Sequence, residues 1–529
     1  MRTRAHARYQ ACVFLLRGLI NRDRRVVASK SADSPRQAPT DTVYGGDRAP
    51  IKDDQSSPRQ KSDPSRLVRL APIVVAMIYL SCTVLLLASG LWPWPIKDPV
   101  LLYGFLILAP LCLLGGYLSA VFGTPRSYSG RWSLRSVFWV CVGTTLVVLP
   151  ATSHARTGSW YPNVVRGLRD PGSAYTNSVA LQASGQWIEY VRILLGVPLT
   201  LLLPLTVYFW KTLTKSMRVM ALIAIGGYLG IYVASGTNKA LADTAILISA
   251  LGAAAVLGGR ISVGRRHVLA VAGTGITAIA LLLVFFSAGQ SSRTGGLAVS
   301  LDINARAPNW SSPARPPDAQ YAALVARGYA FSPAKYQREH PHAGSPLVLA
   351  HLNYWLVAPL PERLRRSFIA LAGYLTQGYY GLSLALEQPY VPTYGLGGSQ
   401  FLARAGGRLV GSTKFEDRPY PMRVEYKDGW DAYGLWSTFY AWIASDITFP
   451  GVLLLMVLIG RLLALGWLDT LEGSNPFAVG AFALLVLMIA YLPANDQLLS
   501  SGESTVGFIG LLALWMWTRR TTAPSPASE

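Results

Sequence analysis

Arginine is the residue type in this chain best suited to chemistry, because fifteen arginines lie in two long polar stretches, residues 152–186 and 289–448. A guanidinium group stays charged and binds phosphate oxygens through paired hydrogen bonds, which suits the capture of a phosphate or a pyrophosphate. A basic loop that is simply solvated explains the same charges equally well. The fifteen are Arg156, Arg166, Arg169, Arg293, Arg306, Arg315, Arg327, Arg338, Arg363, Arg365, Arg366, Arg404, Arg408, Arg418 and Arg423.

One lysine, Lys239, stands in the short turn Ser235-Gly236-Thr237-Asn238-Lys239 between two apolar runs. The turn is too short to hold the ammonium group far from a membrane surface. Lys239 therefore either binds an anion or is an interfacial lysine that reaches towards water. Asp243 lies four residues later on the same helical face and is a possible neutralising partner, in a pair worth on the order of a few tenths of a kcal/mol.

Several common catalytic motifs are absent from the sequence. There is no GxxxxGK[ST] phosphate loop, so an ATP-driven pump is not predicted. There is no HExxH motif and no paired CxxC, and we interpret His340, His342 and His351 as ordinary polar loop residues rather than a metal site. Nor is there an Asp-x-Asp pair to hold a divalent metal against a sugar diphosphate. We expect no metal and no cofactor.

The elements that position these residues are predicted to be membrane-spanning helices. Hydrophobic residues make up 51% of the 529 residues and charged residues only 14%, against about 25% in a soluble domain. The net charge of +21 would suit nucleic acid, but much of the basic charge lies beside apolar runs, where it sets membrane orientation. We therefore expect no nucleic-acid partner. The four cysteines lie outside both polar stretches, so a disulfide scaffold is excluded.

Ten apolar runs are long enough to cross a bilayer, which needs about 20 residues per helix. We predict an all-α polytopic membrane protein with about ten transmembrane helices, or up to twelve, and one large outer loop. The runs are Leu70–Leu91, Val100–Phe122, Val137–Ser153, Trp187–Trp210, Val219–Gly236, Leu241–Gly258, Val268–Ala288, Phe449–Trp467, Phe477–Pro493 and roughly Leu498–Trp517.

The charges of the short loops predict the orientation. The loops 123–135, 211–218 and 259–267 each hold three basic residues and no acidic one, whereas the intervening short loops hold few charges. Positive loops stay in the cytoplasm, so both termini are predicted to be cytoplasmic, in the cell (inner) membrane. The inner loop Leu468–Pro476 breaks this pattern with Asp469 and Glu472, and Arg519 and Arg520 restore it.

Five regions follow from this topology. Residues 1–66 form a basic, mostly disordered cytoplasmic tail, with binding to anionic lipid as an alternative. Residues 67–288 hold seven helices, 289–448 the large outer loop, 449–518 the last three helices and 519–529 a cytoplasmic tail. Within the loop, Pro346–Pro359 and Ser367–Leu386 are apolar, and we favour interfacial or re-entrant helices over two further spans around Arg363–Arg366.

Three stretches have recognisable patterns: SGTNK at 235–239; YLTQGYYGL at 374–382, followed by PTYGLG at 392–397; and STFY at 437–440, with Asp446 ahead of FPG at 449–451. Together they resemble the O-antigen or oligosaccharide repeat-unit polymerases (the Wzy type), within the wider O-antigen ligase superfamily. Lys239 replaces the arginine of that superfamily's Ser-Arg turn. The likeness in arrangement covers about residues 70 to 518.

The resemblance implies that a glycan moves from a polyprenyl pyrophosphate carrier to a sugar hydroxyl of another carrier-linked unit, on the outer side of the membrane and without a metal. The reaction needs cations for the departing pyrophosphate and a base for the acceptor proton. The candidate cations are Lys239, Arg156, Arg293, Arg404 and Arg408, and the candidate bases are Asp446, His340 and Glu503. Tyr379, Tyr380, Trp430 and Trp436 are candidate sugar-binding rings.

Each of these roles has a plainer alternative. Asp446 equally suits a helix-entry cap before Phe449, and core packing is the commoner role of the four aromatic residues. The spacing Arg-x10-Gly of such polymerases occurs at Arg156, Arg418 and Arg423, but about as often as chance allows.

The resemblance also implies partners: the lipid-linked oligosaccharide, membrane lipid, and a flippase and chain-length regulator of the same pathway. A ligase that transfers finished glycan to a lipid or protein uses similar parts. A polysaccharide or lipid transporter is the rival from another class, because transporters often have broken helices and buried ionisable residues.

Overall fold

The computed structural model of the protein describes residues 65–91, 96–130, 132–183, 187–237, 239–261, 361–411, 414–430 and 435–520, together with residues 94, 359 and 432. Within these ranges the chain is helical, apart from one antiparallel pair of two-residue strands, β1 (Ser127–Tyr128) and β2 (Arg519–Arg520). The predicted tail up to residue 64 and the predicted span Val268–Ala288 lie outside the described residues.

Six described helices are long and apolar enough to cross a membrane, as expected of a membrane-embedded helical protein. A seventh span results if the bent pair α7 (Trp187–Leu194) and α8 (Gly196–Tyr208) counts as one. The apolar helix α20 (Pro476–Tyr491) and helix α21 (Gly502–Thr518) coincide with the last two predicted runs. The six are α2 (Arg66–Ala88), α3 (Pro99–Leu118), α4 (Leu134–Thr157), α9 (Lys215–Ala234), α10 (Lys239–Leu257) and α19 (Thr438–Glu472).

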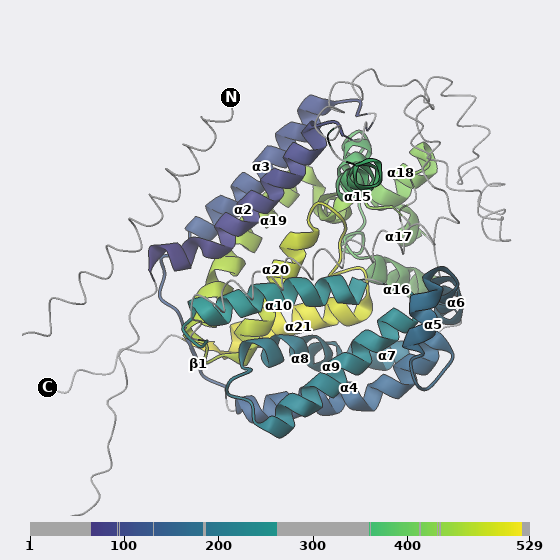
Figure 1. Ribbon diagram of the computed structural model, residues 1–529. Coiled ribbons are helices and arrows are strands. Elements are labelled where there is room, and N and C mark those ends of the chain that lie inside the picture. Colours follow the sequence, from purple (N-terminus) through teal and green to yellow (C-terminus); the bar gives the residue numbers. More distant parts are fainter. Residues whose placement is uncertain are drawn as a thin grey trace, which may run out of the picture. The chain divides into compact units, whose positions relative to one another are not determined.

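Glycines allow the long helices to touch through their backbones. Helices α2 and α3 lie side by side, with α19 packed against them (Figure 1). A Cβ at Gly116 of α3 would overlap the carbonyl of Val457, and one at Gly460 of α19 would overlap the carbonyl of Leu113. Such small-residue contacts are typical of helix pairs in membranes, where close packing replaces the hydrophobic effect as the driving force.

Helix α19 begins eleven residues before the predicted span Phe449–Trp467, in a region that the sequence analysis assigned to the outer loop. A kink at Thr448 (φ 65°, ψ 165°) divides its 35 residues. The kink has a clear cause, because Pro450 has no N–H to donate to the carbonyl of Asp446 four residues earlier. The hydroxyl of Tyr390 donates to that carbonyl instead, at 2.9 Å.

The predicted span Trp187–Trp210 is also broken, since α7 and α8 meet at an angle of 61°. Pro198 cannot donate to the carbonyl of Leu194, which removes a helical hydrogen bond at the junction. At Gly196 the backbone of α8 approaches α21 so closely that a Cβ would lie 2.5 Å from the carbonyl oxygen of Glu503. The break places the charged side chains of α7 next to the start of α21.

The loops with predicted cytoplasmic charge meet at one end of the helices. Asp469, the acidic exception in the charge pattern, is fully buried, and its carboxylate accepts from Arg519 Nε at 2.6 Å and from the N–H of Arg126 at 3.0 Å. Arg260 donates to the carbonyl of Gly473. Asp469 is therefore neutralised within the protein, which explains why it does not disturb the excess of positive charge at this end.

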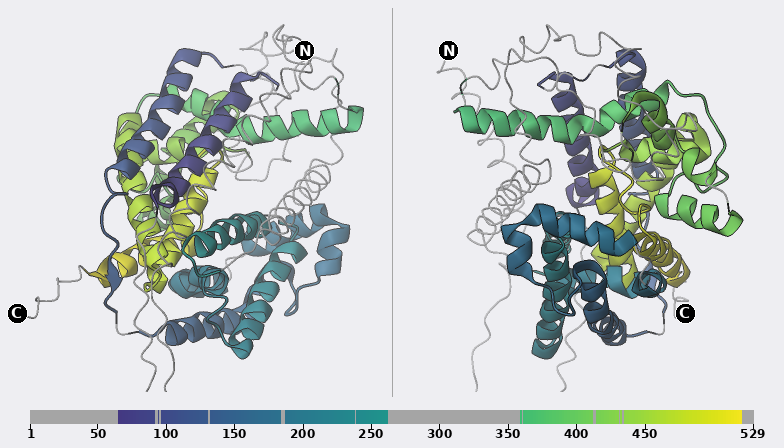
Figure 2. Two further views of the ribbon diagram at one scale, coloured as in Figure 1. Left: turned by 60° about the vertical axis from the view of Figure 1, so that its left-hand side comes forward. Right: turned by 90° about the vertical axis from the view of Figure 1, so that its right-hand side faces the viewer.

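The described part of the predicted outer loop is a set of helices. They are α15 (Glu362–Leu386), α16 (Gln400–Val410), α17 (Lys414–Asp417) and α18 (Tyr420–Asp428). Helix α15 runs across the direction of α2 and α3 in both views of Figure 2 and is not among the candidate spans. This arrangement favours the interfacial interpretation of Ser367–Leu386. The segment Pro346–Pro359 lies outside the described residues except for its last one.

Candidate anion-binding site

Four helix ends form a pocket in the first predicted outer segment. Gly158, with φ of 73°, ends α4 in the left-handed conformation. Two short helices follow, α5 (Val164–Arg169) and α6 (Pro171–Ala183). The side chain of Asn163 caps α5 by accepting from the N–H of Arg166 at 3.0 Å. The carboxylate of Asp170 caps α6 by accepting from the N–H of Ser173 at 3.0 Å. These local caps set the two short helices against the end of α9.

Two glycines bring these helices into backbone contact with α9 and the turn that follows it. A Cβ at Gly167 of α5 would overlap the carbonyl oxygen of Val233, and one at Gly236 would overlap that of Pro171. Gly236 also has a φ of 67°, which side-chain-bearing residues rarely adopt. The predicted turn Ser235–Lys239 is therefore part of the packing that closes the pocket.

The resulting cavity, here called the Arg156 pocket, has a volume of about 140 Å³, well above what a single water needs. Its lining includes two guanidinium groups, two amide side chains and two hydroxyls, and no carboxylate. This set of donors suits an anion with several oxygens. The lining residues are Arg156, Thr157, Ser159, Asn163, Arg166, Ala174, Asn177 and Ala234.

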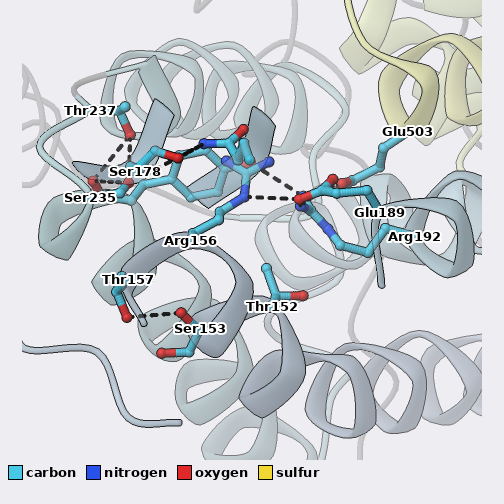
Figure 3. Close-up of polar contacts among 12 residues, drawn as sticks. Thr152, Ser153, Arg156, Thr157, Ser178, Glu189, Arg192, Ser235, Thr237 and Glu503 are labelled. Atoms are coloured by element: carbon cyan, nitrogen blue, oxygen red, sulfur yellow. Dashed lines mark hydrogen bonds and ion pairs between the residues drawn. The ribbon is translucent and has the colours of Figure 1, made fainter. Parts of the chain in front are cut away.

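A buried network of charges holds Arg156 (Figure 3). Glu189 of α7 lies 3.4 Å from Arg156 Nε and also accepts from Arg192 Nη1 at 2.9 and 3.0 Å. Arg192, only 2% exposed, donates in turn to Glu503 of α21. The guanidinium of Arg156 also lies over the ring of Tyr232 at 4.9 Å. The network fixes Arg156 on one side and joins the pocket to α21.

Lys239, predicted to bind the pyrophosphate, does not line this pocket. It is exposed at the first residue of α10. Its suggested partner Asp243 accepts a hydrogen bond from the hydroxyl of Tyr491 at 2.7 Å. The role of Lys239 in anion binding stays a prediction.

Asp496 is a buried carboxylate that the sequence analysis did not single out. Its Oδ1 accepts from the N–H of Leu499 at 3.3 Å, and its Oδ2 has no partner among the described residues. Burial raises the pKa of Asp496 well above its ordinary value, while the hydrogen bond from Leu499 and the ammonium of Lys239 act in the opposite direction. Asp496 and Lys239 are thus linked electrostatically.

Asp446, the first candidate base, lies two residues before the kink of α19, and its side chain bonds to the loop at 393–398. Its carboxylate accepts from the N–H groups of Gly397 at 2.9 Å and Gly398 at 2.6 Å, and from the hydroxyl of Thr393. All three donors belong to the loop at 393–398. The geometry favours a role in holding the 393–398 loop.

Glu503, a further candidate base, is engaged by Arg192 as described above. The third candidate, His340, lies outside the described residues, as does the candidate cation Arg293. Arg404 and Arg408 are exposed on α16, where Arg404 donates to the carbonyl of Gln400 and Arg408 to the hydroxyl of Tyr190. The structure therefore brings neither arginine of α16 to the Arg156 pocket.

The four aromatic candidates lie in or against the protein core. Tyr379 is 1% exposed and shares a hydrogen bond with Thr83, and Trp430 is 3% exposed. Tyr380 stacks on Trp94 with ring centroids 5.1 Å apart, and both rings pack edge-on against Trp430. Trp436 packs against the ring of Tyr374 at 4.2 Å. Core packing thus accounts for Tyr379 and Trp430, whereas Tyr380 and Trp436 are partly exposed and their sugar-binding role stays a prediction.

Sequence reasoning missed most of the pocket. It named Arg156 as a candidate cation and Arg166 only among the fifteen arginines, and it gave no role in the site to Asn163, Asn177, Glu189 or Arg192. One available signal was the spacing from Arg156 to Gly167, which chance alone explained. In the structure the arginine lines the pocket and the glycine permits the helix contact that closes it.

Comparison with known proteins returned no matching family model, no matching curated protein and no matching solved structure. The described residues contain no group of three or more His, Cys, Asp or Glu side chains that could hold a metal ion. The chemistry of the site therefore has to be argued from its own residues.

Proposed function

We propose that this protein polymerises polyprenyl-pyrophosphate-linked oligosaccharide repeat units into a surface polysaccharide at the outer face of the membrane. In the reaction, an acceptor sugar hydroxyl attacks the anomeric carbon of the donor. The bond between that carbon and the phosphate oxygen breaks, polyprenyl pyrophosphate leaves with the bonding electron pair, and the hydroxyl proton passes to a base.

The Arg156 pocket is the observation that carries this proposal. It combines Arg156 and Arg166 with amide and hydroxyl donors, next to the ends of helices long enough to cross a bilayer. A polyprenyl pyrophosphate has to keep its chain among lipids while its phosphates meet fixed cations. Preorganised cations aimed at the charge that develops on a leaving group lower the barrier of the transfer, so no metal is required.

Glu189 is the best placed base. Its side chain is 32% exposed and contacts the arginine of the pocket, whereas the side chain of Glu503 is 12% exposed and held by Arg192. Arg156 and Arg192 both contact Glu189 and hold its carboxylate beside the pocket.

Analysis of the surface glycan in a deletion strain tests the function. Loss of a polymerase should leave single repeat units attached to the final acceptor, whereas loss of a ligase should leave long chains on the carrier. Purified protein given lipid-linked repeat units should produce longer lipid-linked glycans. Normal polymer in the deletion strain would refute the proposal.

One observation favours a transporter as a second candidate. The break between α7 and α8, with the buried Arg192 beside it, resembles the broken helices and buried charges that build transporter sites. A transporter predicts that repeat units accumulate on the inner side of the membrane in the deletion strain. It also predicts movement of lipid-linked glycan across proteoliposome membranes without any increase in chain length.

A further inference from the structure

The loop at residues 392–398 is attached to α19 through one carboxylate. Asp446 accepts from both ends of the loop, from Thr393 at its start and from Gly397 and Gly398 at its end. The hydroxyl of Thr393, which is fully buried, also lies 2.6 Å from the carbonyl of Ser445. The two ends are therefore fixed, and the residues between them have to bridge a short gap.

Tyr394, at the tip of this loop, is strained and exposed. Its φ of 56° is in the left-handed region, which a residue with a side chain adopts at a cost in stability, and Gly395 follows with a φ of 83°. Its side chain is 72% exposed, so core packing does not compensate for that cost. Strained residues that a rigid surrounding holds in place are concentrated at functional sites.

The surface around Tyr394 is aromatic and cationic. The guanidinium of Arg418 lies 5.7 Å from the centroid of the Tyr394 ring and donates to the carbonyl of Pro392 at 3.3 Å. Tyr390, 42% exposed, precedes the loop, and its hydroxyl donates to the backbone carbonyl of Asp446 at 2.9 Å. In the segment 387–399 these two tyrosines are the exposed aromatic side chains, beside the exposed Pro389 and Pro392.

We propose that Tyr394, with Arg418 beside it, is a stacking platform for a pyranose ring of the glycan, and that Asp446 is the residue that positions it. A sugar ring has an apolar C–H face, which matches an aromatic face, and a rim of hydroxyls, which matches the guanidinium and phenol groups. The choice of a sugar ligand rests on the proposed function, whereas the positioning by Asp446 rests on geometry alone.

Binding of soluble oligosaccharides to purified wild-type and variant protein tests the platform. The probe is an array of oligosaccharides from bacterial surface polysaccharides. Tyr394→Ala should weaken binding by about tenfold or more, and Tyr394→Trp should retain it. Tyr394→Gly should remove the ring and the strain together, so that binding falls while the thermal unfolding temperature stays level or rises. Trp517→Ala, at a side chain 73% exposed, is the matched control and should leave binding unchanged.

Kinetics separate a positioning role of Asp446 from that of a base. Asp446→Asn replaces an acceptor oxygen by a donor and should release the loop, so KM for the acceptor glycan should rise by about tenfold with kcat largely kept. A base would instead lose about 10²–10⁴ in kcat. Thr393→Val should mimic Asp446→Asn, and the double variant should be no worse than either single one.

The outcomes distinguish this inference from the proposed function. Oligosaccharide binding that depends on Tyr394, without any polymerisation, would support the platform and refute the polymerase. Polymerisation and glycan binding that survive Tyr394→Ala would refute the platform alone. Wild-type protein that binds no oligosaccharide on the array, or a Tyr394→Ala variant that loses only binding to lipid vesicles, would also overturn it.

Discussion

At the scale of single residues, the structure distinguishes between arginines that were equal candidates for binding pyrophosphate on sequence alone. Arg156 is half-buried, is held by Glu189 and Tyr232, and faces a pocket. Arg404 and Arg408 are exposed on one helix. A fixed cation stabilises a developing charge better than a mobile one, because it does not have to reorganise during the reaction. Arg156 is therefore the residue on which we expect activity to depend most.

Arg156→Ala should lower the rate of polymerisation by about 10²–10³, the usual cost of losing one transition-state donor. Arg156→Lys should polymerise at a rate between those of the wild type and Arg156→Ala, because lysine keeps the charge but loses the paired hydrogen bonds. The rate is measured as chain extension of lipid-linked repeat units at matched protein levels. Arg169→Ala, at an exposed residue of the same segment, is the control and should extend normally. Wild-type rates in Arg156→Ala would exclude the pocket as the pyrophosphate site.

Asp496 should make stability depend on pH. Its raised pKa means that the folded state binds the proton more tightly than the unfolded chain does. Its contribution is fully present below the ordinary aspartate pKa of about 3.9 and is lost as the pH rises through the raised pKa. The apparent unfolding temperature of the wild type, measured relative to Asp496→Asn in detergent, should therefore fall as the pH rises above about 4.

Lys239→Met provides the control for Asp496. Removing the ammonium should raise the pKa of Asp496 further and shift this loss of stability to higher pH. If the difference in unfolding temperature between the wild type and Asp496→Asn does not change with pH, the carboxyl group has the same pKa in the folded and unfolded states, which would contradict this prediction.

At the scale of elements, the position of the polar side chains depends on breaks in helices and on close contacts between helices more than on helix length. The break between α7 and α8 brings Glu189 and Arg192 to α21. The kink of α19 leaves a carbonyl that Tyr390 satisfies. Glycine at 167 lets α5 rest on the backbone of α9. The break and the kink place polar groups where a straight helix would not bring them. Gly167 allows a contact between backbones that a larger residue would prevent.

Gly167→Ala should open the Arg156 pocket, because its Cβ would overlap a backbone carbonyl that cannot rotate away. We expect a lower unfolding temperature together with a loss of polymerisation. The matched control is Gly226→Ala in α9, where nothing lies within 4 Å of the added Cβ, and it should be neutral or slightly stabilising. Equal behaviour of the two variants would contradict the close contact between α5 and α9.

At the scale of the whole molecule, contacts separate two ends of the helices. Arg126, Arg260 and Arg519 gather with Asp469 and the residues that follow it at one end. The Arg156 pocket, the Asp446 attachment and Asp496 come from segments predicted on the other side. The separation matches the alternation of charge in the sequence, and the positive-inside rule predicts which end is cytoplasmic.

Topology reporters check that orientation. Fusions at Arg131 and Arg265 should report the cytoplasm and a fusion at Arg315 the outer side, since the basic loops alternate with loops of low charge. A fusion near Arg365 decides whether the region before α15 returns to the cytoplasm. A reporter at Arg265 on the outer side would reverse the assignment and place the pocket inside the cell.

Chelation tests the catalytic contribution of the fixed cations as a set. If Arg156 and Arg166 neutralise the pyrophosphate, chain extension in purified membranes should be unchanged by EDTA, because no metal takes part in the transfer. The readout is the length distribution of lipid-linked glycan with and without the chelator. A requirement for Mg²⁺ or Mn²⁺ would refute the cation mechanism and leave the pocket without its assigned role.

Hydropathy and charge in the sequence were enough to predict the helical membrane architecture. A bilayer requires about 20 apolar residues per crossing, so each span can be predicted from one continuous stretch of sequence. Eight of the ten predicted runs each overlap one described helix, Trp187–Trp210 is divided between α7 and α8, and Val268–Ala288 lies outside the described residues. Six described helices, or seven with the bent pair counted as one, are long and apolar enough to cross a membrane. The resemblance to a polysaccharide polymerase also came from the sequence and stays a prediction.

Tertiary structure alone decided which polar residues meet. Arg192 and Glu503, or Thr393 and Asp446, are far apart in the chain, and their pairing depends on how helices break and pack. The same holds for the rings of Tyr379 and Trp430, since an aromatic residue that packs in the core and one that binds a ligand can have the same local sequence pattern. Periodicity describes one helix at a time, whereas a site is a property of several helices in contact.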